Sequence, residues 1–197
     1  MTPLSDTFLE TLAAAAVREG VADAVFTRLR TPLGRLLVVQ GEQGIVRIGF
    51  EEEPEDRLLA EVAAGVGPRI VASDRELAAT RDALSAYLEG EGDTLVLPFD
   101  LRLARAPFRR EVLETLQREV GRGEVITYGA LAARSGHPRA HRAVGTACAR
   151  NPVPIVVPCH RVLPSTGGVG NYGGGPARKI ALLELEGALP HGLPSTG

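Results

Sequence analysis

Residues 127–162 read TYGALAARSGHPRAHRAVGTACARNPVPIVVPCHRV, and this stretch decides the fold of the C-terminal half. Its first part, TYGALAARSG, predicts a short helix that Thr127 caps and Gly136 ends. The next part predicts a second short helix, with Pro138 in its first turn and an end at the Asn-Pro pair of residues 151–152. Two short helices around a glycine turn are typical of a helix-turn-helix, although most such pairs only pack together.

The second helix is predicted to bury one face and to leave another nearly bare. The residues of the buried face recur at every fourth position: Ala140, Val144 and Cys148. On another face of the same helix, the residues beside Arg142 are the small Gly145 and Ala149. A glycine tolerated on a surface helix, at a cost of ~1 kcal/mol, is one interpretation. The other is a face that approaches something narrow, such as the minor groove of DNA, which is ~6 Å wide.

The same stretch ends in a cysteine beside a histidine, Cys159-His160, with Pro158 before them. The thiolate is the nucleophilic form, and a free thiol of pKa ~8.5 is only a few per cent ionised at neutral pH. A nearby base raises that fraction, which makes Cys159 a candidate nucleophile. Because neighbours on a strand point to opposite sides, a direct Cys–His pair requires irregular chain after Pro158, or a bridging water. A buried structural cysteine is the alternative, and it is the preferred interpretation of Cys148.

A glycine-rich loop follows, STGGVGNYGGGPARK over residues 165–179. Residues 168–173 match G-x-G-x-x-G, but a dinucleotide site requires this loop inside a βαβ unit and an acid ~20 residues further on. Here a single terminal helix follows and the chain ends too soon. We therefore interpret the loop as backbone that approaches a ligand closely, because glycines permit such an approach.

Charge is distributed unevenly along the 197 residues. Residues 1–100 carry nine arginines and 18 acidic side chains, a net charge of −9, whereas residues 101–197 carry 13 basic and six acidic side chains, a net charge of +7. A polyanion is attracted by the second half, where arginine supplies every basic residue except Lys179. Uneven surface charge without a functional meaning is the alternative.

Composition excludes several classes of protein. Two cysteines form neither a disulfide framework nor a four-cysteine zinc site, which favours a reducing compartment such as the cytoplasm. No apolar run approaches ~20 residues, so no transmembrane helix is expected. Residues 1–20 predict an amphipathic helix, because acids stand where a signal peptide needs positive charge.

The N-terminal half has the pattern of an α/β domain. Residues 24–50 alternate and are rich in β-branched side chains, with turn residues at 31–34 and 41–44, so they predict three antiparallel strands. Helices are predicted over residues 51–65, over 74–90 with Leu77, Leu84 and Leu88 on one face, and over 107–121 with Val112, Leu116 and Val120 on one face. The segment 93–107 contains two prolines and predicts an extended connector, which separates domains of residues 1–97 and 98–197.

Taken together, these motifs resemble one family. The chain contains GEVITYGALA and GHPRAHRAVG, followed by NPVPI, PCHRV, GNYGGG, Lys179 and LLELEG. In this order, the motifs resemble those of the O6-alkylguanine-DNA alkyltransferases, or methylated-DNA–protein-cysteine methyltransferases. The resemblance is dense from Pro98 to Gly187 and looser over residues 21–97. It implies an α/β fold class: a ribonuclease-H-like N-terminal α/β domain and a mostly helical C-terminal domain with a helix-turn-helix and the active-site cysteine.

The resemblance implies roles in the reaction for five residues. Cys159 would accept the alkyl group, and His160 would relay its proton through water to Glu186. Tyr128 would crowd the 3′ phosphate of the lesion and donate to the ring nitrogen of the flipped base. Asn151 would be the hinge between the recognition helix and the active-site turn.

It also implies residues that bind substrate and DNA. Cys159, Val162 and Gly173 would recognise guanine through their backbones, with Tyr172 and Pro154 beside them. Arg142 would fill the space that the flipped guanine leaves. The remaining DNA-binding residues would be Thr127, Tyr128, Ala143 and Gly145, with Arg105 and Arg139 facing phosphates.

The implied activity is irreversible transfer of the alkyl group from O6-alkylguanine, and from O4-alkylthymine, in double-stranded DNA to the cysteine of a monomer. The base would flip out through the minor groove, and the thioether would end the reaction after one turnover, without cofactor. The N-terminal half has no Cys or His, so the structural zinc of some relatives is not expected. Three departures concern packing and DNA affinity: Leu113 in place of tryptophan, no proline before Gly123, and the bulky His141 beside Arg142.

Three other functions use part of the same pattern. A cysteine hydrolase would use the Cys–His pair but would turn over, and it would not need a basic helix-turn-helix. A DNA-binding regulator would need the helix-turn-helix but not Cys159. A lesion-binding protein without catalysis would replace the cysteine that this chain keeps.

Overall fold

The computed structural model describes residues 5–92 and 94–189, so residues 1–4 of the predicted N-terminal helix lie outside the described part. The chain forms two compact units. The first comprises residues 1–89 and 95–103, and the second comprises residues 90–94 and 104–197. The boundary expected between residues 97 and 98 therefore lies inside a segment, 95–103, that contributes to the first unit.

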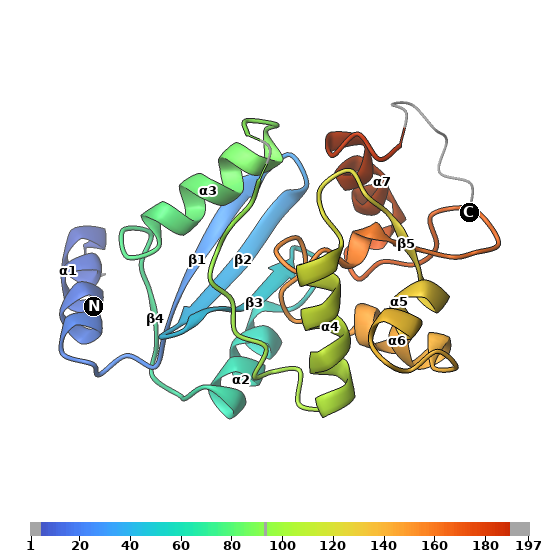
Figure 1. The fold of residues 1–197 in the computed structure, drawn as a ribbon. Helices are drawn as coiled ribbons and strands as arrows, with labels where there is room; N and C mark the ends of the chain where they lie inside the picture. The colour runs from blue at the N-terminus through green and yellow to red at the C-terminus, as the bar shows by residue number, and fades with distance from the viewer. Residues whose placement is uncertain (1–4, 93, 190–197) are drawn as a thin grey trace. The chain divides into compact units, whose positions relative to one another are not determined.

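A four-stranded sheet forms the centre of the first unit (Figure 1). The alternating stretch gives β1 (Ala24–Thr31), β2 (Gly34–Gly41) and β3 (Gly44–Phe50), paired antiparallel as predicted. A fourth strand, β4 (Ile70–Ala72), lies parallel to β1, so the order is β3-β2-β1-β4. Strand β4 was not expected from the sequence pattern, because it is only three residues long.

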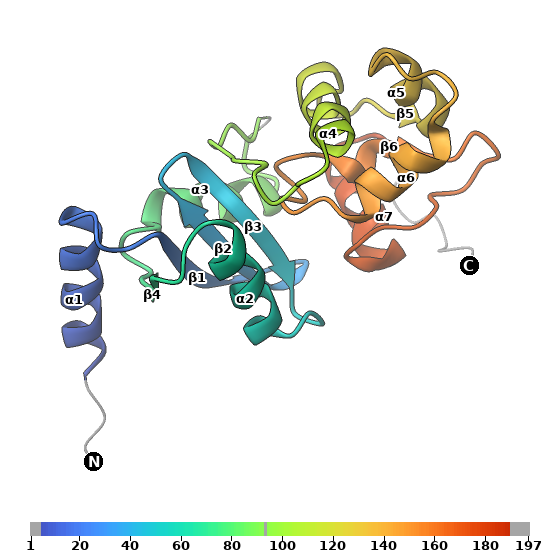
Figure 2. The ribbon, with the colours of Figure 1, turned by 90° about the horizontal axis from the view of Figure 1, so that it is seen from below.

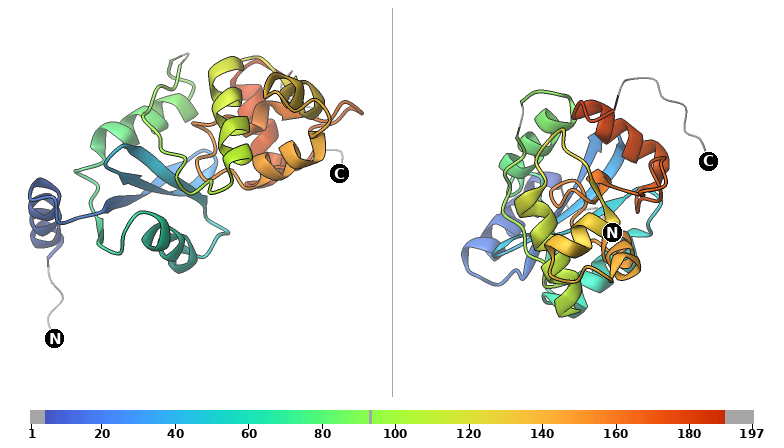
Figure 3. Two further views of the ribbon diagram at one scale, coloured as in Figure 1. Left: turned by 60° about the horizontal axis from the view of Figure 1, so that its bottom comes forward. Right: turned by 45° about the vertical axis from the view of Figure 1, so that its right-hand side comes forward.

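Helices cover both faces of this sheet, which explains why β2 is buried on both sides. Helix α2 (Glu55–Gly65) packs Leu58 and Val62 against one face, together with Phe26 of β1. Helix α3 (Ala78–Leu88) lies on the other face, where the hydroxyl of Thr80 donates to the side chain of Gln40 at 2.8 Å. Figure 3 shows the two helices on opposite sides of the strands.

The connector pairs with the free edge of β3. Ile45 donates to the carbonyl of Pro98 at 2.9 Å, and Asp100 donates back to the carbonyl of Ile45 at 2.9 Å. Gly44 has φ +131°, and a Cβ on it would lie 2.4 Å from the backbone of Pro98. Only glycine fits this contact, which ties segment 95–103 to the sheet.

The predicted amphipathic helix is α1 (Asp6–Arg18), capped by Ser5. Its side chains Phe8, Leu9 and Leu12 are exposed. The carboxylate of Glu10 fixes the helix to the end of β4 by accepting hydrogen bonds from the hydroxyl of Ser73 and, at 2.9 Å, from the backbone of Asp74.

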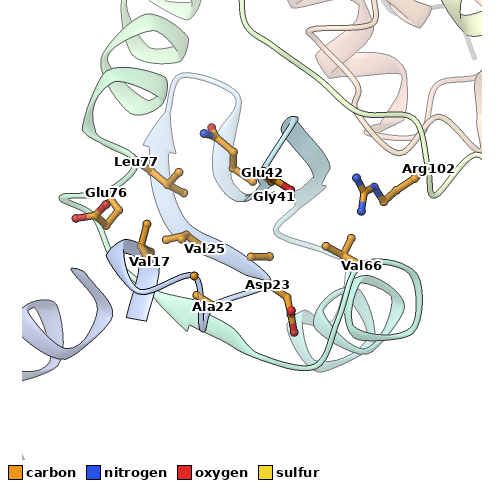
Figure 4. A pocket seen from close by; sticks show the side chains of 13 residues that line it. Val17, Ala22, Asp23, Val25, Gly41, Glu42, Val66, Glu76, Leu77 and Arg102 are labelled. Carbon is orange, nitrogen blue, oxygen red and sulfur yellow. The ribbon is translucent and has the colours of Figure 1, made fainter. Parts of the chain in front are cut away.

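Between the end of α1 and the sheet lies a pocket of about 570 Å³, shown in Figure 4. Two of its charged side chains are paired. Arg102 bonds to Asp100, and Asp23 bonds to Arg69, whose hydrogen bonds lower the pKa of Asp23 to about 2. The rest of the lining is mostly apolar side chains and backbone, with Glu42 and Glu76 as its other charged residues.

The second unit is mostly helical. Helices α4 (Pro107–Glu119), α5 (Tyr128–Arg134) and α6 (His141–Ala149) pack against one another (Figure 2). The remaining elements are the two-residue strands β5 (Ile126–Thr127) and β6 (Val162–Leu163), paired in parallel, the short 3-10 helix η1 (Cys159–Arg161), and helix α7 (Gly175–Leu185).

The helical face predicted for α4 is confirmed, and that of α6 is confirmed in part, because Ala140 precedes the helix and is only half-buried. Val112, Leu116 and Val120 are buried, as are Val144 and Cys148. The predicted start of α6 is wrong: the helix begins at His141 rather than near Pro138. Pro138 lies instead in a turn that the hydrogen bond from Ala140 to the carbonyl of His137 closes at 2.9 Å, and the helix starts only after that turn.

Candidate active site

An irregular turn carries the chain to Cys159. Pro154 pairs with Val157 in an isolated bridge, and Ile155 between them has φ 75°. A positive φ is strained for a β-branched residue, at a cost of about 1–3 kcal/mol. The chain then enters η1, so Cys159 and His160 lie on helical rather than extended backbone. This confirms the expectation that the chain leaves regular strand geometry here.

Asn151 forms three hydrogen bonds to this turn and the residues around it. Its amide nitrogen donates to the carbonyl of Val157 at 2.8 Å and to Sγ of Cys159 at 3.2 Å. Its amide oxygen accepts from the backbone N–H of Val153 at 3.0 Å. Asn151 is itself buried, and it immediately follows α6 and its C-cap Arg150. One side chain therefore connects the end of α6 to the thiol.

Cys159 lies at a pocket of about 410 Å³ between the helix-turn-helix and the glycine-rich loop. One wall comes from α5 and α6, and the opposite wall comes from the loop that precedes α7. The lining residues are Tyr128, Gly145, Cys148, Ala149 and Cys159, with Pro164, Gly170, Asn171, Tyr172 and Gly173 of the loop. The loop closes on itself at this wall, because a Cβ on Gly170 would lie 2.8 Å from the ring of Pro164.

The thiol of Cys159 is held in its neutral form at rest. Burial raises its pKa to about 11, and the hydrogen bond from Asn151 and the charge of Lys179 oppose that rise without cancelling it. The thiol proton must therefore leave during any reaction in which this sulfur acts as a nucleophile. Burial also raises the pKa of Cys148, so this second pocket thiol is protonated as well.

His160 and Glu186 form a buried pair behind the cysteine. Nε2 of His160 lies 2.7 Å from Oε1 of Glu186, a direct contact, so no water separates these two groups. Burial lowers the pKa of His160, so the ring is neutral at neutral pH. With Nε2–H donating to the carboxylate, Nδ1 is the basic nitrogen, and it is buried without a hydrogen-bond partner among the described residues.

Arg161 completes this cluster. It donates to both oxygens of Glu186, at 2.8 and 3.1 Å, and to the carbonyl of Val120 at 2.6 Å. The guanidinium thus neutralises the buried carboxylate and joins η1 to the end of α4. A buried ion pair that also satisfies a backbone carbonyl fixes geometry more than it adds stability.

Tyr128 faces the pocket from the first turn of α5. Burial, together with the nearby cysteines, raises the pKa of its hydroxyl to about 12, so the hydroxyl keeps its proton. It can therefore donate a hydrogen bond to a base in the pocket. A Cβ on Gly145 would lie 4.0 Å from the ring of Tyr128, so this ring lies beside the glycine of α6.

Four of the seven predicted DNA-binding residues are exposed, whereas Thr127, Tyr128 and Gly145 are half-buried. Arg142 and Ala143 on α6 are exposed, as are Arg139 in the turn and Arg105 before α4. Thr127 caps α5 by accepting from the N–H of Ala130 at 3.1 Å, as expected. The face of α6 that carries Arg142 has no other bulky side chain except His141.

Four of the nine residues predicted for the reaction and the substrate line this pocket: Tyr128, Cys159, Tyr172 and Gly173. The other five are buried and do not line it: Asn151, Pro154, His160, Val162 and Glu186. Conversely, Arg161 and Lys179 were given no role, although both are buried here. Periodicity gave a signal for Lys179, which lies on the same helical face as Leu182, Leu183 and Glu186. No group of three His, Cys, Asp or Glu side chains in the described chain is arranged to hold a metal ion.

Comparison with known proteins places both units in one family. Residues 107–188 match the DNA-binding domain of 6-O-methylguanine DNA methyltransferase, and residues 24–101 match its ribonuclease-like domain. The methylated-DNA–protein-cysteine methyltransferase of Salmonella typhimurium is 39% identical over 165 residues, which cover 82% of this chain and 95% of that protein. These matches confirm the predicted family and the ribonuclease-like α/β domain joined to a helical DNA-binding domain.

Two solved structures show the same fold. The O6-methylguanine methyltransferase of Mycobacterium tuberculosis aligns with a TM-score of 0.72 and 31% identity, covering 86% of this chain and 96% of that one. An OGT of the same organism in complex with DNA aligns with a TM-score of 0.70 and 32% identity, covering 83% and 93%. This chain therefore belongs to the 6-O-methylguanine DNA methyltransferase family, which binds DNA and repairs it by transferring a methyl group to a cysteine.

Proposed function

We propose that Cys159 is the acceptor of this protein and that O6-alkylguanine in double-stranded DNA is its substrate, with O4-alkylthymine as a second. The position of Cys159 carries the proposal, because the thiol lies at a pocket that the helix-turn-helix itself lines. In the transfer, a bond forms between Sγ and the alkyl carbon while the bond from that carbon to O6 breaks. The electron pair of the broken bond goes to O6, and guanine leaves after taking up a proton.

His160 and Glu186 handle the proton of the thiol. The thiol is neutral at rest, so its proton must pass to a base as sulfur attacks. Nδ1 of His160 is that base, reached through a water, while Glu186 stabilises the resulting imidazolium at 2.7 Å. This is a change from the expected route, because the water belongs between sulfur and His160 and not between His160 and Glu186.

The target base has to leave the duplex to reach this sulfur. Cys159 is 4% exposed, so a base inside the helix stack cannot contact it. Flipping costs a few kcal/mol, less for a damaged pair, and needs a group that occupies the vacated space. Arg142 on the bare face of α6 suits that role in the minor groove, and Tyr128 donates to the flipped base. Of the residues expected to recognise guanine, Cys159, Tyr172 and Gly173 line the pocket and take that role, whereas Val162 and Pro154 do not line it.

The thioether formed is a poor leaving group, so one protein repairs one lesion. We infer that the protein acts as a monomer, because one unit supplies the sulfur, the base and the DNA-binding face. Both cysteines are free thiols, which supports action in a reducing compartment, the cytoplasm. Among the described residues, none of the helices has the length and hydropathy needed to cross a membrane.

The test is incubation with a duplex that contains one O6-methylguanine, followed by peptide mass spectrometry. One methyl group per protein, on the peptide with Cys159, is the expected result. Cys148→Ala should leave this stoichiometry at one. Repeated turnover would instead indicate a hydrolase, and tight binding without any transfer would indicate a lesion-binding protein. Label on Cys148 would place the acceptor elsewhere.

A further inference from the structure

The segment that joins α5 to α6 is basic. Its arginines Arg134, Arg139 and Arg142 are exposed, and within the described part of the chain none of them forms an ion pair. Exposed arginines of this kind attract the phosphates of DNA. One carboxylate, that of Glu111 on α4, nevertheless lies at this segment. Because an acid repels phosphates, its position is unfavourable for DNA binding unless another group neutralises it.

His137 is the residue of the turn that contacts this carboxylate. Nε2 of its ring lies 3.1 Å from Oε2 of Glu111, and the ring packs edge-on against Phe108, with the ring centroids 5.0 Å apart. The backbone of His137 is fixed as well, because its N–H donates to the carbonyl of Ala132 at 2.8 Å and its carbonyl accepts from the N–H of Ala140 at 2.9 Å. The ring is therefore held at one position, where α4 meets the turn of the helix-turn-helix.

The other ring nitrogen of His137, Nδ1, is open to a ligand. It forms no hydrogen bond to any described residue, and 43% of the side chain is exposed. With Nε2–H donating to the carboxylate, Nδ1 of a neutral ring is an acceptor and cannot bind a phosphate oxygen. In a protonated ring both nitrogens donate, so the same ring can contact Glu111 and a phosphate together. Histidine changes between these two forms at roughly pH 5 to 8.

The charged groups around this ring differ from one side to the other. From α4, Glu111 is the charged side chain in contact with the ring, and 54% of it is exposed. From the end of α5 and from the turn, the ionisable neighbours are Arg134 and Arg139, and from the start of α6 the neighbour is His141. A phosphate bound at the turn thus meets basic groups along the turn and one carboxylate on the side of α4.

We propose that His137 is a proton-dependent phosphate contact of the helix-turn-helix, and that duplex DNA binds with uptake of a proton from solvent by this ring. The proton neutralises Glu111 and supplies an N–H donor to a phosphate oxygen, so one ring bridges the carboxylate and the phosphate. Affinity for DNA therefore increases as the pH falls. A charge-assisted contact to phosphate also releases a counterion, so the salt dependence of binding becomes steeper in the same direction. The inference rests on the proposed function, in which this face binds duplex DNA.

The test measures the binding of an undamaged duplex by fluorescence anisotropy between about pH 6 and pH 8, at several salt concentrations. An undamaged duplex carries no alkyl group, so no reaction competes with binding. The wild-type affinity should rise by about fivefold to tenfold from pH 8 to pH 6, as expected when a bound phosphate favours the protonated ring by about one pH unit. The slope of log affinity against log salt concentration should steepen by up to about 0.9, the contribution of one phosphate contact.

Two substitutions separate the ring from its carboxylate. His137→Gln keeps a side chain that can form hydrogen bonds but cannot take up a proton, so both pH effects should disappear. Glu111→Gln should bind DNA several-fold more tightly than the wild type at pH 8, because the acid is gone. At pH 6 the affinities of Glu111→Gln and the wild type should agree within about twofold, because the protonated ring then neutralises the acid in the wild type.

His141→Gln is the matched control. His141 is also an exposed histidine of this face, but no carboxylate of a described residue contacts it. This variant should therefore keep most of the wild-type pH dependence. Circular dichroism of each protein at each pH verifies that the folded state is the one that binds.

Three results would overturn the inference. The first is a wild-type affinity and salt slope that stay constant between pH 6 and pH 8. The second is a His137→Gln protein that keeps the wild-type pH dependence. The third is a His141→Gln protein that loses as much of this dependence as His137→Gln does, because the effect would then belong to the general charge of the face. Failure of the proposed function gives a different signal, since the wild-type protein would then not bind the duplex at any pH.

Discussion

Replacing Asn151 by alanine should destabilise the second unit and slow alkyl transfer together. The substitution removes the three hydrogen bonds that Asn151 makes to Val153, Val157 and Cys159. The N–H of Val153 would be left buried without its partner, at a cost of about 1–3 kcal/mol. The carbonyl of Val157 would keep its bond from the backbone of Cys159 and lose one worth about 0.5–1.5 kcal/mol.

Together these terms give a loss of about 2–4 kcal/mol in the free energy of unfolding. For a protein of this size, 1 kcal/mol lowers the melting temperature by roughly 2–4 °C, so Asn151→Ala should melt about 5–15 °C lower. The lost N–H···S hydrogen bond also raises the pKa of Cys159, so the reaction with O6-benzylguanine should slow by the same factor at every pH below that pKa. Differential scanning calorimetry and a pH–rate series measure the two effects.

Asn171→Ala is the control, since it deletes an exposed asparagine of the same unit. It should melt within about 2 °C of the wild type. A melting temperature of Asn151→Ala that matched this control would refute the reasoning, because the hydrogen bonds of Asn151 would then contribute nothing to the folded state.

Further predictions concern DNA, pH and the product. Arg142→Ala should slow repair in duplex DNA by far more than it slows the reaction with free O6-benzylguanine. Equal losses of rate on both substrates would rule out Arg142 as a wedge in the groove. Arg105→Ala or Arg139→Ala should instead flatten the salt dependence of duplex binding. Burial lowers the pKa of His160 below its ordinary ~6.5, so the unfolded chain binds the extra proton and stability should fall as pH drops below about 6.5. His160→Asn should weaken that dependence in melting curves between pH 7 and 5, and an unchanged slope would show that another group titrates. The protein methylated at Cys159 should have a melting temperature several degrees below that of the unmodified protein, because an added methyl in a packed site costs about 1–3 kcal/mol. Benzylation should lower the melting temperature further. Identical melting temperatures of all three forms would mean that the pocket has space for the added group.

Local patterns predicted much of the fold. The alternation over residues 24–50 gave β1 to β3 and both of their turns. The helical periodicity of residues 107–121 gave α4 and its buried face. Strand β4 escaped prediction because three residues carry no period of their own, and its conformation depends on β1 alone. The start of α6 was misplaced because Pro138 suits a turn as well as the first turn of a helix.

The site was predicted less completely than the fold. The PCHRV motif identified the cysteine and its histidine, because the residue types themselves carry that chemistry. The state of the thiol was not predicted, since burial, Asn151 and Lys179 reach it from segments separated in sequence. The same limit applies to Arg161, whose partners Val120 and Glu186 lie 41 and 25 residues away. The protonation state of the thiol and the partners of Arg161 depend on residues that are distant in sequence and close in the fold. The spacing of residues along the chain does not specify them.

The short ladder between β5 and β6 has a consequence for how this chain can diverge. Ile126 pairs with Val162 and Thr127 with Leu163, so every residue of the helix-turn-helix and of the acceptor turn lies inside a loop whose two ends are bonded together. An insertion or deletion inside that loop must leave the positions of β5 and β6 unchanged. Otherwise Cys159 would move relative to α6, the helix proposed to flip the base. Just beyond the ladder, residues 165–168 are exposed, and a side chain on Gly167 or Gly168 would meet no other atom within 4 Å. Changes of length should therefore accumulate at residues 165–168 in evolution, and a peptide tag inserted there would be carried into solvent.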